Sequence, residues 1–156
     1  MKARILVWLV ALFCCHNASF AQKEFVNTSV RLSGHPRILL QKGEEKALKK
    51  VIMKDAVWKD IHLSLVDEAG EIVKLPLNER IKTGRRLLSV SRENLRRIFI
   101  LSYAYRMTGK SEFLKRAESE MLKAASFSDW NPSHFLDVGE MTMALAIGYD
   151  WLYPQL

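Results

Sequence analysis

Cysteine is nearly absent from this 156-residue chain. Its two cysteines, Cys14 and Cys15, lie in an apolar run that follows Lys2 and Arg4, and a polar stretch ending in ASFA comes next. This order of basic, apolar and small residues is typical of a secretory signal peptide at residues 1–21, cleaved after Ala21. The apolar run is short for a membrane span, and an uncleaved anchor is the alternative. The exported chain would then lack disulfides, thiolate metal sites and cysteine nucleophiles, so its hydrophobic core must stabilise it.

Metal-ligand spacing is also missing. The histidines that remain after cleavage, His35, His62 and His134, are far apart in the sequence, and no His-x-x-x-His pattern occurs. A zinc site would need such clustered ligands. The sequence therefore predicts no metal site and no cofactor.

Negative charge is in short supply. The net charge is +7 and becomes +5 when Lys2 and Arg4 leave with the signal peptide. Nucleic acid is an improbable partner for an exported protein, so this charge favours anionic polysaccharide, lipid headgroups or other envelope surfaces. Plain solubility explains the same charge equally well.

Residues 22–42 are expected to be extended. Beyond this N-terminal stretch, the alternation of apolar and polar residues that is typical of strands does not occur. Helical patterns follow over 43–156. We expect helices at 44–55, 56–74, 92–109 and 111–127, a last helix capped by Ser133, and a helix over 78–90 interrupted near Gly84. Val57, Ile61, Leu65 and Ala69 form one apolar face of the second helix, and Ser91 is the expected N-cap of the 92–109 helix. The predicted class is all-α, built of antiparallel helical hairpins.

One of these hairpins, over 95–125, is similar to a tetratricopeptide-type unit, with small residues and glycine between its two helices. No second copy follows at a fixed period. The hairpin is therefore expected to be one member of a larger helical stack.

The last helix combines an apolar body with a polar beginning. Its residues are apolar around almost the whole circumference, which predicts a helix enclosed by others. His134, Asp137 and Glu140 form a polar arc at its N-terminal end. Either the two carboxylates pair with basic residues or with helix N-terminal amides, or the three side chains line a cleft with Trp130 and Asn131, residue types that stack on sugars and bind their hydroxyls.

Basic residues gather in two segments. Guanidinium groups bind carboxylate and sulfate in bidentate geometry, so these segments could receive an acidic glycan; a solvated helix face is the alternative. The first segment contains Arg80, Lys82, Arg85 and Arg86, and the second contains Arg92, Arg96 and Arg97.

Three stretches resemble the N-terminal part of the heparinase II/III-like polysaccharide lyases: GHPRILL, GRRLLSVSRENLRRIFILSYAYRMTG and WNPSHFLDVGEMTMALAIGYDWLY. The resemblance implies an (α/α) toroid, of which 43–156 would be the first helices, and β-elimination of uronate-containing polysaccharides such as heparin, heparan sulfate or alginate. It implies export to the periplasm of a Gram-negative bacterium. The catalytic residues of that family would lie beyond Leu156, so we assign no catalytic residue here. The tyrosines at 103, 105, 149 and 153 are expected in the core.

Two functions stay open at this point. The first is the N-terminal portion of an exported lyase, inactive as it stands, with Trp130, Asn131, His134, Asp137, Glu140, Arg85 and Arg86 as candidate substrate-binding residues. The second is a non-catalytic helical module that binds acidic glycan or a partner protein. A glycoside hydrolase is disfavoured, because Asp137 and Glu140 lie on adjacent turns of one helix and not across a cleft. Because residues 43–156 would leave such a toroid unclosed, the apolar last helix is expected to expose a large hydrophobic face and promote association.

Overall fold

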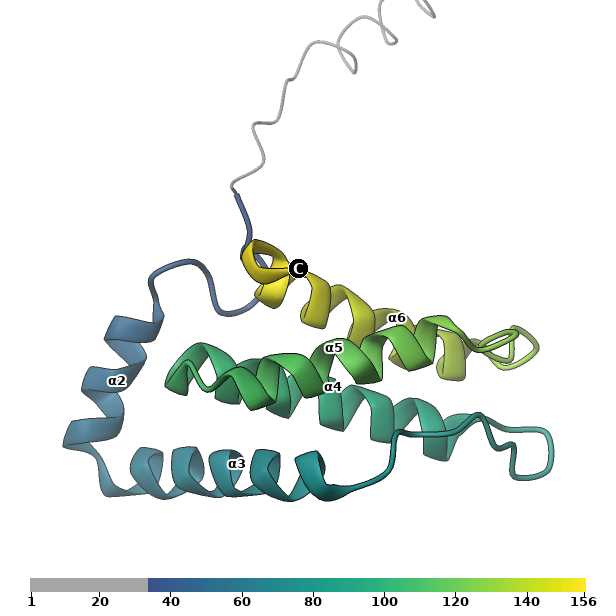
Figure 1. Ribbon diagram of the computed structural model, residues 1–156, viewed down its shortest axis with the longest axis horizontal. Helices are drawn as coiled ribbons and strands as arrows, with labels where there is room; N and C mark the ends of the chain where they lie inside the picture. The colour runs from purple at the N-terminus through teal and green to yellow at the C-terminus, as the bar shows by residue number, and fades with distance from the viewer. Residues whose placement is uncertain (1–33) are drawn as a thin grey trace, which may run out of the picture. The chain divides into compact units, whose positions relative to one another are not determined.

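The computed structural model describes residues 34–156, and its longer helices run alongside one another (Figure 1). The predicted signal peptide, residues 1–21, lies outside the described residues. The elements in chain order are α2 (Glu45–Lys54), α3 (Ala56–Lys74), α4 (Leu88–Thr108), α5 (Ser111–Ala125), α6 (Phe135–Leu152) and the 3₁₀ turn η1 (Tyr153–Gln155). Within 34–156 no strand forms, and a single bridge joins Thr83 to Arg86. The all-α prediction is confirmed.

Local signals explain where several helices begin and end. The Asp55 carboxylate accepts hydrogen bonds from the backbone N–H groups of Val57 and Trp58 and so caps α3. Gly109 takes a left-handed conformation, φ +74°, directly after α4, and its N–H donates to the carbonyl of Tyr105 at 2.7 Å. A glycine adopts this conformation without steric cost, which permits the tight turn into α5.

The core lies where α4 meets α3, α5 and α6. Its largest members, all almost fully buried, are Ile72, Leu101, Phe113 and Leu152. Gly148 brings α6 close to its neighbours, because a Cβ placed there would lie 2.5 Å from Ile98 Cγ2 and 2.8 Å from Met121 Sδ.

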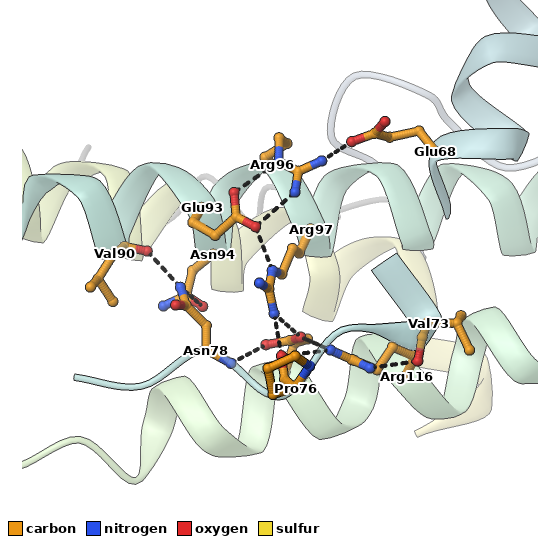
Figure 2. Close-up of polar contacts among 11 residues, drawn as sticks. Glu68, Val73, Pro76, Asn78, Val90, Glu93, Asn94, Arg96, Arg97 and Arg116 are labelled. Atoms are coloured by element: carbon orange, nitrogen blue, oxygen red, sulfur yellow. Dashed lines mark hydrogen bonds and ion pairs between the residues drawn. The ribbon is translucent and has the colours of Figure 1, made fainter. Parts of the chain in front are cut away.

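A buried ionic network fixes the start of the loop between α3 and α4 (Figure 2). Glu120 of α5 is inaccessible to solvent, and its Oε1 accepts hydrogen bonds from Arg97 Nη1 at 2.9 Å and Arg116 Nη2 at 2.7 Å. Both arginines also donate to the carbonyl of Pro76, and the Glu120 Oε2 accepts from the Asn78 backbone. Since each buried charge has an opposite partner, the network ties this loop to α4 and α5.

Three local predictions are wrong. Residues 75–87 form no helix; they make a loop in which Gly84 has φ +60° and Thr83 pairs with Arg86. Helix α4 begins three residues before Ser91, whose hydroxyl donates to the Leu88 carbonyl from inside the first turn. The N-cap position of α6 is His134 and not Ser133, and its side chain makes no capping hydrogen bond.

The apolar surfaces also differ from expectation. On α3 only the C-terminal half is covered: Ala69 is buried, whereas Val57 is 67% exposed. Helix α6 is covered on one side alone, and Tyr149 and Tyr153 are about half exposed, so neither is a core residue. The prediction of an enclosed helix is wrong, and the prediction of an exposed hydrophobic face is confirmed. None of the helices within 34–156 is long and apolar enough to cross a membrane.

Candidate functional site

The two long loops of the structure meet at one end of the bundle, which we call the loop end (Figure 1). The loop end comprises the loops 75–87 and 126–134 and the first turns of α4 and α6. An ion pair joins the loops: Arg80 Nη2 lies 2.7 Å from Asp129 Oδ1, and Arg80 Nε donates to the Asp129 carbonyl at 3.0 Å. Most of the predicted site residues lie here.

Asp137 joins the beginnings of α4 and α6. Its side chain is fully buried, and its Oδ2 accepts hydrogen bonds from the Leu87 backbone N–H at 2.8 Å and the Asn131 amide at 2.7 Å. Burial raises the pKa of this carboxyl, but these two hydrogen bonds and the nearby charges of His134 and Arg86 outweigh it, so the pKa is lowered overall. Asp137 therefore acts as a buried carboxylate that satisfies the N-terminus of a neighbouring helix.

Glu140, one turn further along α6, is half-buried. It accepts hydrogen bonds from the Ser91 hydroxyl at 2.8 Å and from Arg92 Nε at 3.1 Å. Both carboxylates of the polar arc thus have partners on or beside α4, as the pairing interpretation expected. Their main role in this structure is to hold α6 against α4.

The other two members of the predicted sugar platform are also engaged. Asn131 is 2% exposed, and its amide donates to the carbonyl of Arg85 as well as to Asp137. Trp130 is half-buried, and its indole N–H donates to the Ala124 carbonyl at 3.0 Å. A sugar could reach the indole face but not the Asn131 amide.

The indole does border open space. A hollow of about 320 Å³ lies between the end of α5 and the start of α6, and Trp130, Phe127 and Pro132 line it. His134, two residues after Pro132, is half-buried, and its Nδ1 lies 3.1 Å from the Ser133 hydroxyl. Trp130 is therefore the member of the predicted set whose ring borders open space at the loop end.

The basic segments divide into two groups. Lys82, Arg85 and Arg86 are exposed, and within residues 34–156 no hydrogen bond or ion pair engages their side chains. Arg92 and Arg96 are paired with Glu140 and with Glu68 and Glu93, respectively. The segment around Gly84 therefore presents three exposed cations without a hydrogen bond or ion pair, two of which still act on nearby carboxyls: Arg86 on Asp137 and Lys82 on Asp129.

For Arg97, both interpretations of the second basic segment, a glycan-binding surface and a solvated helix face, are wrong. Its side chain is 9% exposed and pairs with Glu93 and Glu120 inside the bundle (Figure 2). It belongs neither to a solvated face nor to a surface that could receive a glycan.

A second polar cluster, at the other end of α6, was not predicted. His35 Nδ1 pairs with the buried carboxylate of Asp150, which also accepts hydrogen bonds from the backbone N–H groups of Arg37 and Ile38 at 2.9 Å. The Tyr153 ring stacks on His35 with centroids 4.3 Å apart. The signal in the sequence was the acidic residue within the apolar stretch GYDWLY, since a buried carboxylate requires partners.

Comparison with known proteins adds no assignment. No protein-family model matches this chain, and no curated protein matches it. In the described residues, no group of three or more histidine, cysteine, aspartate or glutamate side chains could hold a metal ion.

Proposed function

We propose that this chain is the N-terminal portion of an exported polysaccharide lyase, and that its loop end binds the acidic chain of a uronate-containing polysaccharide. The observation that carries the proposal is the group of three exposed cations Lys82, Arg85 and Arg86, whose side chains make no hydrogen bond or ion pair within residues 34–156. They lie in the loop 75–87, at the same end of the bundle as the half-buried indole of Trp130. Guanidinium groups bind carboxylate and sulfate in bidentate geometry.

The chemistry of a uronate suits this surface. Each uronate carries a carboxylate, and sulfated polymers carry further anionic groups, so an extended anionic chain can contact several cations along the loop. The half-buried Trp130 lies on the companion loop 126–134, where its indole can pack against a pyranose ring. The loop end would then position the polymer for β-elimination, with the proton-transfer groups supplied elsewhere in the enzyme.

A second candidate is a binding module without turnover, which holds an acidic glycan or a partner protein. The exposed Lys82, Arg85 and Arg86 and the Trp130 indole support it equally, because binding an acidic glycan needs no proton-transfer group. The two candidates share the loop end and differ in the fate of the polymer.

Oligosaccharide binding tests the loop end. Heparin-derived and alginate-derived oligosaccharides are titrated into the protein by calorimetry, with a neutral dextran oligosaccharide as the negative control. Replacing Arg85 and Arg86 by alanine should weaken binding about tenfold or more, because one charged hydrogen bond contributes about 1.5 kcal/mol. The matched control, Lys49→Ala with Lys50→Ala, removes the same charge from exposed positions of α2 and should leave affinity nearly unchanged.

The reaction products separate the alternatives. A polymer ending in an unsaturated uronate after incubation with the natural gene product indicates elimination and supports the lyase. Binding without such ends supports the binding module. Absence of binding to both acidic oligosaccharides, or equal losses in the two double variants, would overturn the loop end as a glycan site.

A further inference from the structure

Trp130 lies between two residues that are each bonded to the loop with the exposed cations. On one side of it, Asp129 accepts hydrogen bonds from the Arg80 guanidinium, at 2.7 Å to the carboxylate and 3.0 Å to the carbonyl. On the other side, the Asn131 amide donates to the Arg85 carbonyl at 2.8 Å. The residue that carries the indole is therefore tied to the cation-bearing loop both before and after it in the chain.

Asn131 makes the better protected of these two ties. It is 2% exposed, whereas the Asp129 side chain is 45% exposed. An exposed ion pair contributes little and is weakened by salt, and a buried hydrogen bond is screened much less. The Asn131 amide also donates to the buried Asp137 carboxylate at 2.7 Å, and the Asn131 backbone N–H donates to Asp129 at 2.7 Å. All the links between the two loops near the indole thus pass through or beside Asn131.

The backbone of Asn131 fits this role. Its φ is +58°, in the left-handed region that few residues other than glycine adopt. Asparagine tolerates this conformation, because its short polar side chain can form hydrogen bonds there. Here the left-handed residue stands between Trp130 and Pro132, and its amide bonds to a carbonyl 46 positions earlier in the chain.

We propose that Asn131 is a positioning residue of the glycan site, which fixes the backbone of Arg85 relative to the neighbouring Trp130. This inference rests on the proposed function and names the residue that organises its binding surface. Asn131 itself does not touch the sugar, because its side chain is buried and its amide nitrogen uses both hydrogens, one on Arg85 and one on Asp137.

Such positioning raises affinity through preorganisation. A polymer that binds two independent loops must order them, and the freedom lost on binding lowers the affinity. In this structure the loops are joined before any polymer arrives. The indole is fixed too, since its N–H donates to the Ala124 carbonyl at 3.0 Å. The ring of Trp130 and the backbone of Arg85 consequently keep a set spacing in the free protein.

Asn131→Gly tests the proposal, with calorimetric titration of the heparin-derived and alginate-derived oligosaccharides. Glycine keeps the left-handed backbone and removes only the amide, so affinity should fall about fivefold to tenfold. The matched control is Asn78→Gly in the same loop as Arg85. The Asn78 amide also donates to one carbonyl and one side chain, those of Val90 and Asn94, both at 3.1 Å, but it has no link to the indole. Its loss should leave affinity nearly unchanged at a temperature where both variants are folded.

A double-mutant cycle distinguishes positioning from a general loss of structure. In protein that already carries Trp130→Ala there is no indole to align with Arg85, so Asn131→Gly should have little further effect on affinity. A general loss of structure would weaken binding by the same factor in both backgrounds. If Asn131→Gly does not fold, Asn131→Asp replaces it, because aspartate has the same size, tolerates the left-handed conformation and lacks the donor when ionised.

The outcomes separate this inference from the proposed function. Absence of binding to either acidic oligosaccharide would overturn both. Binding that is weakened by Arg85→Ala with Arg86→Ala but unchanged by Asn131→Gly would overturn this inference and leave the proposed function standing. Equal losses for Asn131→Gly and Asn78→Gly, or an equal effect of Asn131→Gly with and without the indole, would also contradict a positioning role.

Discussion

Glu120 shows what a single residue contributes to this fold. Its carboxylate is inaccessible to solvent and lies between Arg97 and Arg116, two arginines from different helices. The geometry is such that one oxygen accepts from both guanidinium groups, while the other accepts from the loop backbone at Asn78. The network has little tolerance for loss of a member, because each remaining charge would stay buried without its partner.

Glu120→Gln should lower the free energy of unfolding by about 3 kcal/mol, since it keeps the shape of the side chain and removes the charge that the two arginines share. Urea denaturation measures this change. Glu118→Gln, at an exposed position of the same helix, is the control and should change stability by less than about 0.5 kcal/mol. Equal stability of the two variants would contradict a structural role for the Glu120 charge.

At the scale of elements, α6 packs tightly against its neighbours at Gly148. Here α6 lies against both α4 and α5, and the absence of a side chain is what permits the contact with Ile98 and Met121. Closely packed interiors tolerate little added volume. The position of α6, and with it the loop end, depends on this residue.

Gly148→Ala should therefore destabilise the protein by about 1–3 kcal/mol, although alanine has the higher helix propensity. Gly70→Ala is a matched control within α3, because a Cβ at Gly70 meets nothing within 4 Å. That substitution should stabilise the protein by about 0.5–1 kcal/mol. Thermal unfolding of both variants provides the comparison, and two changes of the same sign would contradict the packing argument.

At the scale of the whole molecule, two buried carboxylates hold distant segments together. Asp137 joins α6 to the start of α4, and Asp150 joins α6 to residues 35–38. Burial raises the pKa of the Asp150 carboxyl, but the backbone N–H groups of Ile38 and Arg37 and the contact with His35 outweigh it and lower the pKa overall. Both ends of α6 are therefore fixed by carboxylates that favour the ionised form.

Acid should consequently destabilise the protein. A carboxyl whose pKa is lower in the folded state contributes stability that is present above the unfolded value of about 3.9 and is lost as the pH falls through the folded value. We expect urea midpoints that change little between about pH 7 and 5 and fall below about pH 4. Asp150→Asn should be less stable at neutral pH and lose less on acidification.

Asp60→Asn, at an exposed position of α3, is the control for the acid experiment and should follow the wild-type pH dependence. Identical acid profiles for Asp150→Asn and the wild type would show that the Asp150 carboxylate does not contribute to the transition.

Sequence periodicity predicted the helices best where their ends carry local signals. Helices α2 and α3 agree with their predicted ranges within a residue, since Asp55 separates them and caps the second. The beginning of α4 was missed because its cap comes from a distant part of the chain: the Leu87 N–H is satisfied by Asp137, fifty positions later in the sequence. No pattern around Ser91 could have revealed this.

The candidate site could be predicted only in part, because its contacts also join distant parts of the chain. The residues of the loop end were named from their chemistry, and the structure brings Arg85, Asn131, His134 and Asp137 to one end of the bundle. Which of them are free was not predictable. Asn131 and Asp137 bond to each other and to the backbone of the 75–87 loop, whereas Arg85 and Arg86 remain exposed.

The sequence by itself determined the helical class and the basic character of the segment 80–86. These follow from composition and from spacings of three or four residues, which act within one helix. Tertiary structure alone decided that Arg97 is buried against Glu120, that His35 pairs with Asp150, and that Gly148 sits between α4 and α5. The physical reason is that the cost of burying a charge, or of placing a methyl group, depends on neighbours that folding brings from 23 to 115 residues away.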